Sequence, residues 1–161
     1  MTQSVPPQPT DGNPFAQKPD AVPPAPPARN NIALGIVAAV VAALVTAGIY
    51  GGIVGATEYE IGYAAVGVGF VIGFAAGKIG GANPALPMVS AILSLGAVYL
   101  GQLIGIAALG ADELGVSVTT VFTDYFDVVT KVWSEDADAL TFVFLGIGAF
   151  AAFSGAKKAA A

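Results

Sequence analysis

The sequence predicts an all-α fold: a polytopic membrane protein with four transmembrane helices, an amphipathic helix in an outer loop, and a disordered proline-rich N-terminal tail. Of the 161 residues, 55% are hydrophobic and only 11% charged, whereas a soluble domain carries about 25% charged residues. The mean hydropathy is +0.75. Glycine and alanine recur every fourth residue inside the apolar segments, a spacing that keeps small side chains on one helix face for close packing in lipid.

The N-terminal region, residues 1–31, differs from the rest of the chain because it holds nine of the eleven prolines. Such a segment buries too little apolar surface to offset the entropy cost of ordering it. We therefore predict a disordered cytoplasmic tail that acts as a spacer. Residues 24–29 also match a PxxP core followed by a basic residue, so a protein partner with an aromatic-lined groove is an alternative role for the tail.

Residues 32–161 form the predicted membrane domain, with four spans at about residues 32–55, 58–77, 87–109 and 138–154. Each span is an apolar segment of roughly the length needed to cross a hydrocarbon core of ~30 Å. Only a few residues separate the first two segments, so these form an antiparallel hairpin. Pro84 and Pro87 precede or open the third segment. Proline suits the start of a helix, because the backbone N–H that it lacks would have no partner within the helix there.

Small residues at four-residue spacing define the expected packing faces of the helices. They are Gly35, Ala39, Ala43, Ala47, Gly51 and Gly55 in the first segment, Ala65, Gly69, Gly73, Gly77 and Gly81 in the second, Ala97, Gly101 and Gly105 in the third, and Gly148 and Ala152 in the fourth. Smooth faces of this kind let helix backbones approach closely in lipid. In the antiparallel hairpin, the small-residue faces of the first two helices could meet backbone to backbone.

The distribution of charge predicts the orientation in the membrane. With four spans, five of the six basic residues fall on one side: Lys18, Arg29, Lys78, Lys157 and Lys158. By the positive-inside rule, both termini are cytoplasmic and the protein is a multi-pass protein of the plasma membrane. Lys131 is the exception, in a loop that is otherwise acidic.

The long outer loop, about residues 110–137, contains an amphipathic pattern over about residues 117–133. Apolar residues recur at three- and four-residue intervals, with threonine and aspartate on the opposite side. Its aromatic residues suit the boundary between headgroups and hydrocarbon: Phe122, Tyr125, Phe126 and Trp133. We expect this helix to cap the bundle or lie on the membrane surface, and a partner-binding surface is the alternative.

Two sets of polar residues are candidate sites. Thr57 and Glu60 have the spacing of a capping box at the start of the second helix, and Glu58 would also lie near the positive end of its dipole. The alternative is that Glu58 and Glu60 form an entry point for a cation or proton. Thr46 and Gln102 lie at similar depth in the predicted membrane core, so we expect a hydrogen bond between them.

The composition argues against an enzyme. The chain has no cysteine and no histidine, which removes thiolate nucleophiles, imidazole acid–base chemistry and zinc–thiolate sites. We therefore predict no catalytic residues, no cofactor and no metal site. A basic patch for nucleic acid is also absent from the sequence, so nucleic acid is not an expected partner.

Three motifs carry a resemblance to a protein family: Tyr59–Gly62 (YEIG), Gly67–Phe70 (GVGF) and Asp138–Phe142 (DALTF). With them the chain resembles uncharacterised small four-span bacterial integral membrane proteins that share a Y-E-I-G…G-V-G-x-x-x-G helical hairpin. The resemblance implies four spans and a long amphipathic outer loop, and it implies no activity.

Two functions remain open on this basis. The first is a non-enzymatic scaffold or accessory subunit of a membrane assembly, whose partners are the lipid bilayer and either further copies of the chain or another membrane protein. The second is a small oligomeric channel or carrier for neutral or cationic solutes, with Glu58 and Glu60 at its outer mouth.

Overall fold

The computed structural model describes residues 30–59 and 62–161, and within them the regular structure is helical, with no strand. The helices are α1 (Ile32–Thr57), α2 (Ala64–Gly80), α3 (Ala85–Leu114), α4 (Val118–Asp124), α5 (Phe126–Asp136) and α6 (Ala139–Ala160). The all-α prediction is confirmed for this part of the chain. The predicted tail, its PxxP segment and Glu60 lie outside the described residues.

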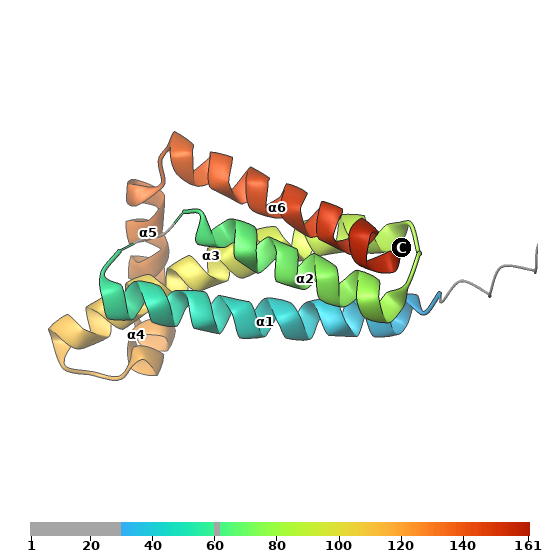
Figure 1. Ribbon diagram of the computed structural model, residues 1–161. Coiled ribbons are helices and arrows are strands. Elements are labelled where there is room, and N and C mark those ends of the chain that lie inside the picture. The colour runs from blue at the N-terminus through green and yellow to red at the C-terminus, as the bar shows by residue number, and fades with distance from the viewer. Residues whose placement is uncertain (1–29, 60–61) are drawn as a thin grey trace, which may run out of the picture.

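Four long helices pack as an antiparallel bundle (Figure 1). α1 and α3 run in one direction, α2 and α6 in the other, and α4 and α5 lie across one end of the bundle. We call this the capped end. The opposite end holds the start of α1, the loop between α2 and α3, and the last turn of α6. Because Lys78, Lys157 and Lys158 lie there, we call it the lysine end.

Three helices, α1, α3 and α6, are long and apolar enough to cross a membrane. With 17 residues α2 is a shorter apolar helix, about 25 Å long at ~1.5 Å per residue. α3 continues five residues beyond the predicted boundary before Gly115, with φ 66°, ends it. α6 likewise extends past residue 154 to Ala160.

The capping box predicted at Thr57 is wrong, because Thr57 is the last residue of α1 and the N-cap position of α2 is Tyr63. The Thr57 hydroxyl donates to the Ile53 carbonyl at 2.7 Å, a bond that a threonine readily makes within its own helix. Glu58 then adopts a left-handed conformation with φ 58°, and its amide donates to the Val54 carbonyl and closes α1.

The predicted single amphipathic helix over residues 117–133 is two helices, α4 and α5, that meet at Tyr125. Ser117 begins α4, since its side-chain oxygen accepts from the Thr120 amide at 3.1 Å. The buried apolar side chains of the two helices, Val121 and Val129, pack on the end of α3. This segment packs on α3 with a bend between its two helices, and its position relative to a membrane surface stays a prediction.

The interior of the bundle is built from small side chains and two close seams. The α2–α6 seam brings Gly69, Gly73 and Gly77 against the backbone of Gly148, Ala152 and Ala156. The α1–α3 seam brings Gly51 and Gly55 against α3, and Gly101 and Gly105 against α1. The core also contains fully or nearly fully buried alanines: Ala39, Ala43, Ala47, Ala65, Ala76 and Ala97.

The glycine-lined faces of α1 and α2 therefore pair mainly with α3 and α6 and not with each other as in our interpretation of the hairpin, although α1 and α2 also lie side by side. Each faces a helix further along the chain, and Gly35 alone among the α1 glycines lies against α2, beside Gly80. Gly81 is also not a packing residue within α2. It is the C-cap of that helix, with φ 77°, a conformation that favours glycine.

Candidate functional site

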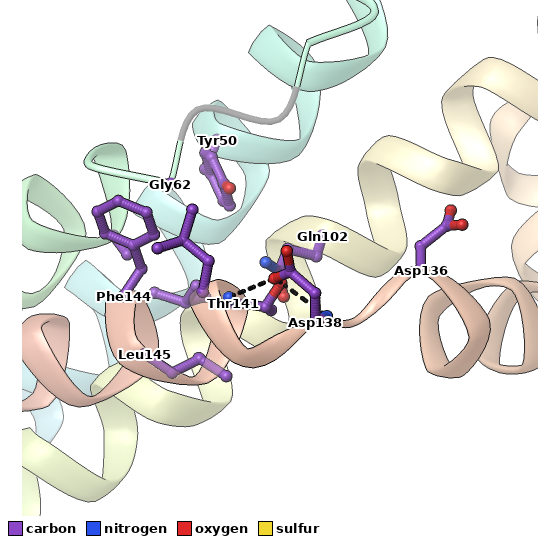
Figure 2. A pocket seen from close by; sticks show the side chains of 11 residues that line it. Tyr50, Gly62, Gln102, Asp136, Asp138, Thr141, Phe144 and Leu145 are labelled. Atoms are coloured by element: carbon purple, nitrogen blue, oxygen red, sulfur yellow. Dashed lines mark hydrogen bonds between the residues drawn. The ribbon is translucent and has the colours of Figure 1, made fainter.

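Polar side chains gather in a pocket at the capped end, where α5, the start of α6 and the middle of α3 come together. The pocket has two hollows of about 180 and 190 Å³ that share Gln102, Asp136 and Thr141. The first is shown in Figure 2 and also reaches Tyr50 and Phe144. We call the two hollows together the capped-end pocket.

Gln102 is a buried polar residue in the wall of this pocket. It is 6% exposed, and its side-chain oxygen accepts from the indole Nε1 of Trp133 at 2.9 Å. The Trp133 ring also packs edge-on against Tyr99, with the centroids 4.7 Å apart. A hydrogen bond at this half-buried site, together with the ring contact, holds α5 against α3.

The predicted bond between Thr46 and Gln102 is wrong. The Thr46 hydroxyl donates to the carbonyls of Ala42 and Ala43, at 2.7 and 3.3 Å. A threonine within a helix can donate to the carbonyls three and four residues before it. Gln102 instead lies where α5 crosses α3. Trp133 was expected at the membrane boundary, and its bond to Gln102 depends on that crossing, which no local sequence pattern indicates.

Asp138 begins α6 and also lines the pocket. Its carboxylate oxygen accepts hydrogen bonds from the Thr141 amide at 2.8 Å and from the Thr141 hydroxyl at 3.0 Å. The Thr141 hydroxyl oxygen in turn accepts a hydrogen bond from the Asp138 amide. Figure 2 shows this pair beside Gln102. The hydrogen bonds from Thr141 lower the pKa of Asp138 below its ordinary value of 3.8, so this carboxylate is charged at neutral pH. The D-x-x-T spacing of residues 138–141 predicts this cap, and it is absent from the predictions above.

Glu58 lines the second hollow, next to Trp133 and Asp136. The structure therefore places one member of the predicted pair of glutamates at the pocket, while Glu60 falls in the part that is not described. All described acidic residues lie at the capped end or in α4 and α5: Glu58, Asp112, Glu113, Asp124, Asp127, Glu135, Asp136 and Asp138. The single lysine among them, Lys131, lies 4.0 Å from Glu135.

The carboxylates of this arrangement suit the attraction of cations. Carboxylates at the mouth of a hollow raise the local concentration of positive ions. Within residues 30–59 and 62–161, no group of three acidic side chains is close enough together to hold a metal ion. The sequence also offers no histidine or cysteine as a general base or nucleophile.

The aromatic residues predicted for the membrane boundary divide into two groups. Phe122 and Trp133 are half-buried and pack against the cluster that α3 forms with Val121 and Val129, whereas Tyr125 and Phe126 are exposed by 48% and 45%. Phe122 and Phe126 also contact each other edge-on across the bend, at 5.4 Å between centroids. The cap therefore has one face toward the bundle and another toward its surroundings.

No family model, curated protein or solved structure matches this chain.

Proposed function

We propose that the protein is a non-enzymatic integral membrane protein that serves as a scaffold or accessory subunit of a membrane assembly. The observation that carries this proposal is the closed interior of the bundle. Ala39, Ala47, Ile72, Ala76 and Ala107 are completely buried, and the seams bring helix backbones into contact. Even the polar residues Ser90 and Ser94 of α3 are completely buried, so they line no open path.

The outward faces of the long helices favour a surrounding of lipid. α1 exposes large apolar side chains along most of its length, and α6 does so over its first half, from Leu140 to Phe150, which is exposed by 70%. The exposed large apolar residues on α1 are Ile32, Leu34, Val37, Val40, Val41, Leu44, Val45, Ile49 and Ile53. Contiguous apolar surface of this kind marks contact with lipid or with another protein.

We infer that α2 is a fourth span. It lies antiparallel to α1 and α3 and packs along α6 (Figure 1). Its length of about 25 Å is close to the hydrocarbon thickness of ~30 Å, and Lys78 near its end is long enough to reach the headgroups. Four spans place Lys78, Lys157 and Lys158 on one side, which makes that side cytoplasmic by the positive-inside rule.

The second candidate function is an oligomeric channel or carrier for neutral or cationic solutes. The observation that favours it is the capped-end pocket, with Glu58, Asp136 and Asp138 at its walls. Because the interior of one bundle is filled, the path would have to form between copies of the chain. In this function the pocket would be the outer mouth.

Ion flux into vesicles separates the two functions. Protein reconstituted in liposomes is compared with the variants Glu58→Gln and Asp136→Asn, and with Glu113→Gln as a matched control outside the pocket. A scaffold gives the same low flux in all four preparations. Flux above that of empty liposomes that falls in the two pocket variants, and not in the control, would overturn the scaffold and support the channel.

The membrane arrangement has its own test. Cysteines introduced at Asn30 and Ala161 are expected to react with a membrane-impermeant thiol reagent only after the cells are opened, because both ends are cytoplasmic. A cysteine introduced at Asp127 in α5 is expected to react in intact cells. Labelling of Asn30 and Ala161 on opposite sides would contradict the four-span arrangement.

A further inference from the structure

A second pocket lies at the lysine end of the bundle and differs from the capped-end pocket in its lining. It has a volume of about 430 Å³ and is formed by the loop between α2 and α3, the start of α3 and the last turns of α6. Its walls include Pro84, Pro87 and Phe153, with Lys157 at the side. An adjoining hollow of about 370 Å³ shares Gly81 and Ala82 with it and is lined by Lys78.

The floor of this lysine-end pocket is held by hydrogen bonds rather than by a loose loop. The Asn83 side-chain amide donates to the Asn30 side-chain oxygen at 2.9 Å, and the Asn83 oxygen accepts from the Ala85 amide at 2.9 Å. The Asn31 amide donates to the Gly80 carbonyl at 2.9 Å. The loop is thereby tied to both α1 and α3, so the pocket is a built feature of the fold.

The charge at this end is entirely positive among the described side chains. Lys78, Lys157 and Lys158 lie here, and the described aspartates and glutamates lie at the capped end or in α4 and α5. Within the described residues, the only ion pair is the one between Lys131 and Glu135, at the other end. The Lys157 ammonium lies 5.3 Å from the centroid of the Phe153 ring, which holds the charge over the apolar wall.

We propose that the lysine-end pocket binds an anionic phospholipid of the cytoplasmic leaflet. This inference rests on the membrane arrangement proposed above, because that arrangement places the lysine end at the level of the headgroups. Lys78 and Lys157 bind the phosphate and the headgroup, and the beginning of an acyl chain lies against Pro84, Pro87 and Phe153. Basic pockets between helices on the cytoplasmic side are suited to anionic lipid headgroups.

The mixed lining decides between a lipid and a soluble anion. A free phosphate is bound by converging polar donors and gains nothing from a proline and phenylalanine wall. A phospholipid presents a negative headgroup joined to hydrocarbon. The 430 Å³ pocket presents Lys157 next to its apolar wall, and the adjoining hollow adds Lys78. The capped end, with its carboxylates, is expected to repel the same lipid.

The test is native mass spectrometry of the detergent-solubilised full chain with added phosphatidylglycerol or phosphatidylcholine. Wild type is expected to retain phosphatidylglycerol in preference to phosphatidylcholine. Lys78→Gln and Lys157→Gln are each expected to weaken phosphatidylglycerol binding about fivefold, from a contribution of roughly one surface cation each. Lys131→Gln, at the capped end, is the matched control and should bind as wild type does.

Two further measurements make the result decisive. Inorganic phosphate is added as a competitor: displacement of the lipid by phosphate at equal concentration would overturn the proposal, because it would show a site for a soluble anion. Equal retention of the two lipids, or an equal loss in Lys131→Gln, would also overturn it.

Extraction of the membranes with alkaline carbonate tests the membrane arrangement separately, since a protein released by carbonate would contradict that arrangement and not merely the lipid site.

Discussion

The α2–α6 seam and the α1–α3 seam use the same four-residue spacing of small residues but tolerate change differently. A Cβ atom built at Gly73 would overlap the carbonyl oxygen, carbonyl carbon and Cα of Ala152. A Cβ atom built at Gly105 would instead meet the Val54 side chain, 2.6 Å from its Cγ1. In the first seam the obstacle is backbone, which moves only with its helix, and in the second it is mainly side chain.

The difference shows that a small residue can be required for two reasons. In the α2–α6 seam it permits contact between backbones, which gains dispersion energy and weak contacts to carbonyl oxygens. In the α1–α3 seam it makes room for a larger residue on the partner helix, such as Tyr50 against Gly101. The first arrangement fixes the distance between the helices, and the second leaves side chains that can adjust.

Gly73→Ala is expected to have the largest effect, because it breaks the backbone contact of the α2–α6 seam. Overpacking of a filled interior costs up to about 3 kcal/mol, and here no flexible atom can give way. The free energy of unfolding, measured by titration with sodium dodecyl sulfate in mixed micelles, should fall by about this amount. An unchanged free energy would mean that α2 and α6 are farther apart than the structure has them.

Gly105→Ala is expected to cost less, about 1 kcal/mol, at the low end of the range for overpacking. The Val54 Cγ1 can rotate away, whereas its Cβ, 2.8 Å from the new Cβ, requires a small shift of α1; the nearest backbone atom, the Gly51 carbonyl oxygen, is 3.6 Å away. The same titration in mixed micelles measures this decrease in the free energy of unfolding. A loss as large as that of Gly73→Ala would remove the distinction between the seams.

Gly67→Ala is the matched control for both variants, because it makes the same chemical change on α2 at an exposed position. A Cβ atom at this glycine would meet nothing within 4 Å. The free energy of unfolding should stay the same or rise by up to about 1 kcal/mol, since alanine favours a helix over glycine. A clear loss would indicate that a partner covers this face of α2.

The smallest expected effect concerns the start of α6, which sets where the α2–α6 seam begins. The pKa of Asp138 is lower in the fold than its ordinary value of 3.8, chiefly because of the hydrogen bond from the Thr141 amide. Its stabilising contribution is therefore present above pH 3.8 and is lost as the pH falls through the lower value in the folded state. Hydrogen exchange of the first turn of α6 should speed up, beyond the intrinsic pH dependence, only in that acidic range.

Asp138→Asn tests this assignment because asparagine can still cap a helix but does not titrate. The variant should retain the first turn of α6 at neutral pH and lose the acid-dependent increase in exchange. If the acid dependence persists in Asp138→Asn, another group at the capped end is responsible.

The sequence by itself determined the class of the fold, the helices of the bundle and the segregation of charge. Low charge, apolar segments and small-residue spacing are local properties, and each dictates helix or burial without reference to a distant residue. The cap at Asp138 is also local, because it needs only Thr141 three residues later. For the same reason Gly35, Ala39, Ala43 and Ala47 could be assigned to a buried face.

Only the tertiary structure decided which faces pair, where α2 begins and what Gln102 binds. Periodicity fixes the face that a helix buries but not the neighbour that covers it, and several faces of this chain are equally smooth. α2 was therefore matched with α1 on sequence distance, whereas its closest packing is with α6. Gln102 likewise bonds to Trp133, 31 residues away, because the position of an interhelical hydrogen bond depends on how the helices cross.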